Sequence, residues 1–68
     1  MSITLKAARV NKGLTQKEAA KLLGIGEKTI AMYESGKTFP DVQMIKKIEE
    51  LYGVSYNEIN FFSAKITV

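Results

Sequence analysis

The segment from residue 15 to residue 36, TQKEAAKLLGIGEKTIAMYESG, constrains the fold more than any other part of the chain. Thr15 and Glu18 have the spacing of a capping box, in which each side chain pairs with a free backbone N–H at a helix start. Gly24 can adopt the left-handed conformation that ends a helix, because glycine has no Cβ. The pattern therefore predicts a helix over residues 16–23, followed by a tight turn.

A second helix is predicted over residues 27–35, ending at Gly36. Small Ala20 stands four residues before Gly24, and apolar Ile30 follows six residues after it. A large side chain at position 20 would hold two crossing helices apart. The spacing therefore favours a helix-turn-helix, in which the two helices cross at a steep angle. The alternative is an ordinary helical hairpin with no nucleic-acid partner.

Apolar residues at helical spacing define the predicted core. A further helix is expected over residues 42–52, capped by Asp41 and ended by Gly53. Its buried stripe should contain Val42, Ile45, Ile48, Leu51 and Tyr52, flanked by Met44. The two earlier helices should contribute Ala19, Ala20, Leu22 and Leu23, then Ile30 and Tyr33. On the first helix of the chain, Leu5, Ala8 and Arg9 share one face.

Both ends of the chain leave a choice between helix and strand. Thr4 can cap a first helix over residues 5–11, but Met1 to Leu5 also alternates apolar and polar residues as a strand does. Ser55 and Glu58 repeat the capping-box spacing and predict a short fifth helix over residues 56–60. The expected fold is a mainly α, compact five-helix domain.

The tail over residues 61–68 has a different pattern. From Phe62 to Val68, apolar residues alternate strictly with polar ones, which favours a short, half-buried C-terminal β-strand. A single strand leaves its backbone groups unpaired and needs a partner. That partner is either the alternating N-terminus of the same chain or a second subunit. The whole of residues 1–68 is expected to form one domain.

Composition argues against catalysis and metal binding. The chain has no cysteine and no histidine, so it lacks disulfides, thiolate ligands and the commonest acid–base group. No apolar run is long enough to cross a bilayer or act as a signal peptide. We therefore expect no enzyme activity, no metal, no cofactor, no small-molecule ligand, and a cytoplasmic protein associated with the nucleoid.

The charge of the chain is unevenly distributed. The net charge is +3, with +4 in residues 1–24 and −2 in residues 41–60. A basic front half and an acidic back half suit a domain that offers one face to a polyanion. Taken alone, this charge distribution favours ordinary solvated helix surfaces. Only together with the predicted helix-turn-helix does it indicate a nucleic-acid partner.

Residues 5–60 resemble the Cro and lambda-repressor type of helix-turn-helix domain, the XRE-like family. The resembling segments are LKAARVNKGLTQKEAAKLLGI, EKTI, YESGKTFPD and IKKIEELYGVS. The resemblance implies a five-helix, sequence-specific DNA-binding transcriptional regulator. It further implies a repressor of prophage or mobile-element type that binds a palindromic operator in double-stranded DNA as a homodimer. The dimer contact would involve either the tail strand or helix 56–60.

The resemblance also implies roles for particular residues. An arginine of the first helix pairs with a glutamate near the end of the third, here Arg9 and Glu34. Contacts to DNA phosphates would come from Gln16, Ser35, Lys37 and Thr38. Such contacts fix the position of the protein without reading sequence, and they make binding fall with salt.

The helix over residues 27–35 would lie in the major groove and read bases from its outward side. With Ile30 and Tyr33 facing inward, the outward residues are Glu27, Lys28, Thr29, Ala31 and Met32. Lys28 can donate to guanine O6 and N7, and Glu27 can accept from cytosine N4. Thr29 and Met32 can touch a thymine methyl group.

This helix departs from the family pattern in three places. Gly26 stands where serine or threonine usually caps the helix, and Ala31 and Met32 replace positions that are often polar. Methionine is common at adaptable protein interfaces. The alternative function is therefore a protein-interaction module on the same fold, of antirepressor or antitoxin-like type, with weak DNA binding.

Overall fold

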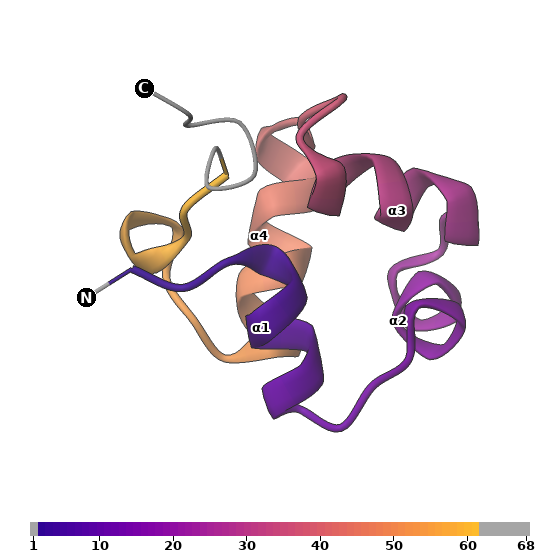
Figure 1. Cartoon of the computed structure of the whole chain (residues 1–68), viewed down its shortest axis with the longest axis horizontal. Coiled ribbons are helices and arrows are strands. Elements are labelled where there is room, and N and C mark those ends of the chain that lie inside the picture. The colour runs from indigo at the N-terminus through magenta and orange to yellow at the C-terminus, as the bar shows by residue number, and fades with distance from the viewer. Residues whose placement is uncertain (1, 62–68) are drawn as a thin grey trace.

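A computed structural model of the chain describes residues 2–61 (Figure 1). Within residues 2–61, four α-helices follow in order and have the predicted bounds: α1 Leu5–Asn11, α2 Gln16–Leu23, α3 Glu27–Ser35 and α4 Val42–Tyr52. A single 3-10 turn, η1 Tyr56–Glu58, comes after α4. None of the helices within residues 2–61 has both the length and the apolarity needed to span a bilayer.

The helices begin at the predicted caps. In the capping box of α2, the Thr15 N–H donates to Glu18 Oε1 over 2.9 Å, and the Glu18 N–H donates to Thr15 Oγ1 over 3.0 Å. Asp41 accepts a hydrogen bond from the Met44 N–H over 2.8 Å, and Thr4 caps α1 in the same way. Each such cap stabilises a helix by about 1 kcal/mol. The hydrogen bonds from Thr15 also lower the pKa of Glu18.

The turn between α2 and α3 brings the two helices close together. Gly24 has φ 74° and ψ 31°, the left-handed conformation, and the Ile25 N–H donates back to the Ala20 carbonyl over 3.0 Å. Ala20 is buried between the helices. In Figure 1, α2 is seen nearly along its axis while α3 runs across the view, so the two helices cross steeply. The crossing expected from the small residue at position 20 is present.

The core lies where the four helices meet. Its buried apolar members are Leu5, Ala8, Ala19, Ala20, Leu23, Ile30, Ile48, Tyr52 and Ile59. Half-buried residues packed against them include Ile3, Leu14, Ile25, Tyr33, Met44, Leu51, Val54 and Phe61. The core therefore draws on every helix, the loops and the segments before and after the helical bundle.

Two residues predicted in the core lie on the surface instead. Leu22 is 63% exposed and Val42 is 69% exposed. Leu22 lies to one side of the α2 stripe formed by Ala19, Ala20 and Leu23. Val42 is the first residue of α4, and the angular position of its side chain falls outside the arc that faces the core. The sequence pattern predicts a broad apolar stripe on each helix, but the stripe that is buried in the structure is narrower and leaves both residues outside it.

The predicted fifth helix is reduced to one turn. The capping box is present, but the helical turn covers only Tyr56–Glu58, and Ile59 is extended with φ −87° and ψ 127°. Ile59 forms an isolated parallel β-bridge with Ile3. The Ile3 N–H donates to the Glu58 carbonyl over 2.7 Å, and the Asn60 N–H donates to the Ile3 carbonyl over 2.8 Å. This pairing draws the backbone out of the helical path.

The N-terminal segment combines the two predicted alternatives. Ile3 pairs as a strand residue would, and Thr4 caps α1. The predicted C-terminal strand falls on Phe62 to Val68, which lie outside the described residues, so it stays a prediction. Within residues 2–61 the N-terminus pairs with the segment after η1.

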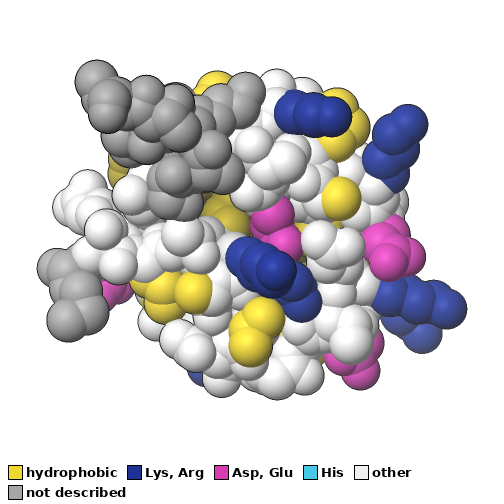
Figure 2. All heavy atoms as spheres, viewed as in Figure 1, with side chains coloured by type: hydrophobic (Ala, Val, Ile, Leu, Met, Phe, Trp, Pro, Cys, Tyr) yellow, Lys and Arg dark blue, Asp and Glu magenta, His cyan; other side chains and the backbone are white. Residues whose placement is uncertain are grey.

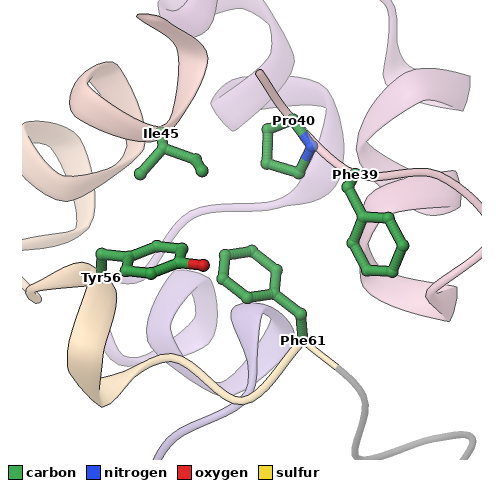
Figure 3. Close-up of a pocket in the computed structure, with 5 residues that line it drawn as sticks. All are labelled: Phe39, Pro40, Ile45, Tyr56 and Phe61. Carbon is green, nitrogen blue, oxygen red and sulfur yellow. The ribbon is translucent and has the colours of Figure 1, made fainter. Parts of the chain in front are cut away.

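A shallow apolar groove opens between the loop before α4, α4 itself and η1 (Figure 3). Its volume is about 190 Å³, and its lining residues are Phe39, Pro40, Ile45, Tyr56 and Phe61. The Phe61 ring lies edge-on to Phe39 at 6.4 Å and tilted against Tyr56 at 5.6 Å. Phe39 and Tyr56 are each about half exposed. The lining contains no charged side chain.

Candidate nucleic-acid interface

A buried ion pair joins the first and third helices. Arg9 of α1 meets Glu34 near the end of α3, with 2.6 Å from Nε to Oε2 and 3.2 Å from Nη2 to Oε1. This two-point geometry is the strong form of an arginine–carboxylate contact. The two side chains are only 8% and 7% exposed. The hydrogen bond with Glu34 raises the pKa of Arg9, against the lowering effect of burial.

Further hydrogen bonds extend this pair into the loop and helix that precede the turn. Arg9 Nη1 donates to the Leu14 carbonyl over 2.7 Å, in the loop between α1 and α2. Gln16 Nε2, at the first residue of α2, donates to Glu34 Oε1 over 3.1 Å. One cluster, made of Arg9, Leu14, Gln16 and Glu34, therefore connects α1, the start of α2 and the end of α3.

Tyr52 lies close to this cluster and is sensitive to high pH. It is 4% exposed, and burial, followed by the negative charge of Glu34, raises its pKa from 10.0 to about 12. The folded protein therefore holds the phenolic proton more tightly than the unfolded chain does. The stabilisation is complete below pH 10 and is lost as the pH rises toward 12.

Between pH 10 and 12, this one group should remove roughly 2–3 kcal/mol of unfolding free energy. Denaturant unfolding measured across this pH range should show the loss in the native protein. A Tyr52→Phe variant, which has no phenolic proton, should lose less stability over the same range. Tyr56, which is half exposed, provides the matched control, and Tyr56→Phe should retain the full alkaline loss.

The first turn of α3 projects away from the core. Glu27 and Lys28 are exposed, whereas Ile30 is only 2% exposed and faces inward. Thr29 and Met32, the other two predicted base contacts, are half-buried, as is Ala31. The outward side of α3 thus offers one exposed cation and one exposed anion, whereas its hydroxyl and thioether side chains are half-buried.

The end of α3 offers polar groups to solvent. Gly36 has φ 78°, and the Lys37 N–H donates back to the Met32 carbonyl over 3.0 Å, which turns the chain sharply. Ser35, Lys37 and Thr38 are all exposed. Ser35 directly follows Glu34, which accepts the hydrogen bond from Gln16. The structure therefore places Gln16, at the start of α2, beside Glu34 near the end of α3.

The surface charge is mixed. On the side formed by α2 and α3, Figure 2 shows basic side chains with acidic side chains among them. Arg9 contributes little to this surface because it is buried and paired. The side chain of Lys12 lies beside Gly53, at the C-terminus of α4, where a cation is favoured by the helix dipole. Two of the basic residues in the front half of the chain, Arg9 and Lys12, therefore interact within the protein.

Two members of the cluster were not predicted in it. For Gln16 the family resemblance implies only a phosphate contact, and its hydrogen bond to Glu34 has no sequence signature because the two residues lie 18 positions apart. The Leu14 carbonyl belongs to the backbone, so its residue type carries no signal. A buried arginine with two carboxylate contacts still has three N–H groups to satisfy, which indicates a further acceptor such as this carbonyl but gives no signal for Gln16.

Two steeply crossed helices, joined at a left-handed glycine and with the second helix exposed at its start, define a helix-turn-helix unit. The sequence matches the helix-turn-helix family over residues 5–59. The chain belongs to this family, in its XRE-type branch. No solved structure is significantly similar to it.

Three curated relatives illustrate the match. The HTH-type transcriptional regulator ImmR of Bacillus subtilis is 45% identical over 75% of this chain and 40% of its own. The cryptic phage CTXphi transcriptional repressor RstR of Vibrio cholerae is 33% identical over 85% and 52%. The uncharacterized HTH-type transcriptional regulator MJ0272 of Methanocaldococcus jannaschii is 37% identical over 87% and 89%. The chain thus spans about half or less of ImmR and RstR.

Proposed function

We propose that this protein is a sequence-specific DNA-binding transcriptional regulator whose helix α3 enters the major groove. The observation that carries the proposal is the exposed first turn of α3, held outward by the close crossing of α2 and α3 at Ala20 and Gly24. Membership of the XRE-type family supports it. The similarity to RstR, whose name describes a phage repressor, favours a repressor of prophage or mobile-element type.

Base readout is assigned to the outward side of α3. Lys28 is exposed and can donate to guanine, and exposed Glu27 can accept from cytosine N4. Thr29 and Met32 are half-buried, and their exposed parts can make apolar contact with a thymine methyl group. This combination favours an operator in which a guanine or cytosine lies next to thymine.

Phosphate contacts are assigned to both ends of the α2–α3 unit. Gln16 supplies its amide at the start of α2, where the helix dipole also favours an anion. Ser35, Lys37 and Thr38 are exposed at the end of α3. Of these four residues, only Lys37 neutralises charge, so it should account for about 0.9 of the log–log salt slope for each subunit.

A second copy of the chain would place two α3 helices on one face of the DNA. The proposed regulator is a dimer on a palindromic operator, with half-sites about 34 Å apart. The chain has two candidate contact regions, the tail over residues 61–68 and the region of η1. The apolar groove beside Tyr56 supports the η1 region, because aromatic side chains are enriched at protein–protein interfaces and the half-exposed rings of Phe39 and Tyr56 would be buried there by a second subunit.

A protein-interaction module on the same fold is the alternative. It is favoured by the apolar content of the α2–α3 surface, where Leu22 is 63% exposed and Ala31 and Met32 replace polar groups. Such a module would bind DNA weakly and a partner protein through these side chains.

A binding selection from random duplexes at near-physiological salt separates the two functions. We expect an enriched palindrome with half-sites one helical turn apart. On that duplex, Lys28→Ala should weaken binding by about 1–3 kcal/mol and relax the preference at one position of each half-site. Lys47→Ala, which removes an exposed lysine of α4, is the matched control and should leave specificity unchanged.

The selection also has outcomes that would contradict the proposal. Absence of any enriched sequence would favour the interaction module. Enrichment of a single half-site without its inverted repeat would argue against a dimer while retaining DNA recognition. Equal losses for Lys28→Ala and Lys47→Ala would remove α3 from the recognition surface.

A further inference from the structure

We propose that Glu34 is a positioning residue for DNA binding, which holds the amide of Gln16 so that its second N–H points to a DNA phosphate. This inference rests on the proposed function. It assigns to one carboxylate two tasks that are usually separate, which are pairing with a buried arginine and orienting a group at the DNA surface.

The amide of Gln16 has the donors that this role requires. A glutamine side chain carries two N–H donors on one nitrogen, which point in fixed, different directions. One donor goes to Glu34 Oε1 over 3.1 Å. The second has no hydrogen-bond partner within residues 2–61, and Gln16 is only half-buried, so this donor can reach an external acceptor.

The orientation of Glu34 is set before any DNA arrives. Arg9 holds both carboxylate oxygens, and the Leu14 carbonyl holds Arg9 from the other side. Glu34 Oε1 therefore has a fixed position from which to orient Gln16. A group that is already oriented loses less conformational freedom on binding, so the contact contributes more to affinity than a free glutamine would.

Two matched backgrounds test whether Glu34 acts through Gln16. The first is the native protein, in which Arg9 holds both oxygens of Glu34. The second combines Arg9→Met with Glu34→Leu, which removes the acceptor for Gln16 and leaves no unpaired cation buried. In each background, the affinity is measured with and without Gln16→Ala. The probe is a labelled duplex of arbitrary sequence at low salt, because phosphate contacts carry no sequence information.

In the native background, where Arg9 holds Glu34 in place, Gln16→Ala should weaken binding roughly three- to tenfold, the range for one hydrogen bond. In the background with Arg9→Met and Glu34→Leu, the same substitution should change affinity less than about twofold, because the amide is no longer oriented. An equal loss in both backgrounds would overturn the positioning role. It would leave the proposed function intact, since that function is judged by the selection for a palindrome.

A second measurement uses the native protein and does not depend on the variants folding. The side-chain amide of Gln16 should be rigid in the free protein by NMR relaxation. On addition of the duplex, the N–H that does not face Glu34 should show the larger chemical-shift change. A mobile Gln16 amide in the free protein would overturn the proposal, as would equal shifts of its two N–H groups.

Discussion

Replacement of Glu34 by alanine should unfold this domain more readily than any surface substitution. The change leaves Arg9 buried without its partner, and an uncompensated buried charge costs about 3–5 kcal/mol. A domain of this size has a total stability of only roughly 3–10 kcal/mol. We therefore expect a fall in melting temperature of more than about 15 °C, or loss of the cooperative transition, in thermal unfolding followed by circular dichroism.

Lys47→Ala is the control for this experiment, because Lys47 is exposed on α4 and its removal should change stability by less than about 0.5 kcal/mol. Equal melting temperatures for Glu34→Ala and Lys47→Ala would show that the ion pair does not support the fold. Arg9→Met combined with Glu34→Leu should recover much of the loss, because apolar replacement of both partners leaves no buried charge.

Leu23→Ala should be the most disruptive apolar truncation on α2, whereas Leu22→Ala should be nearly silent. The two leucines are adjacent, but Leu23 is 4% exposed and Leu22 is 63% exposed. Truncation of a buried leucine removes its transfer free energy and leaves a cavity, at a cost of about 2–5 kcal/mol. Truncation of an exposed one should cost less than about 0.5 kcal/mol. Urea unfolding of both variants gives the two values directly.

This pair of variants controls for helix propensity, since both exchange leucine for alanine on the same helix. Similar losses for Leu22→Ala and Leu23→Ala would mean that Leu22 is covered in solution, by another part of the chain or by a second copy. If Leu22→Ala leaves stability unchanged, as expected, and also lowers affinity for a protein partner, the interaction-module function gains support.

Under the proposed function, stability and DNA recognition depend on some of the same residues. Arg9 and Glu34 link the core to both ends of the proposed DNA-binding unit, through Leu14 and Gln16. A substitution in this cluster is therefore expected to change the melting temperature and DNA affinity together. In contrast, Lys28 lies outside the cluster, and its substitution should alter affinity without altering stability. Thermal unfolding of each DNA-binding variant distinguishes the two cases.

The helical framework could be predicted closely because its signals are local. Thr4, Thr15 and Asp41 act as caps for the helices that follow them, and the left-handed glycine at position 24 ends α2. Each of these signals involves groups only a few residues apart, so the residue types alone determine the outcome. The crossing of α2 and α3 could also be predicted from the sequence, because it requires a small side chain at one defined position, here Ala20.

The errors occurred where distant parts of the chain decide the outcome. The helix predicted over residues 56–60 stops after one turn because Ile59 pairs with Ile3, more than fifty residues away in sequence. Leu22 and Val42 have the residue type of a core position, but the width of the buried stripe depends on how closely neighbouring helices pack. Local periodicity contains no information about that width.

The sequence by itself determined the bounds of the four α-helices within residues 2–61 and which family the chain resembles, since these depend on short-range capping and spacing. Only the tertiary structure decided that Gln16 shares Glu34 with Arg9 and that Leu22 faces solvent. Hydrogen bonds and burial between distant segments depend on how the helices are placed in three dimensions. That placement is a collective result of packing the whole core.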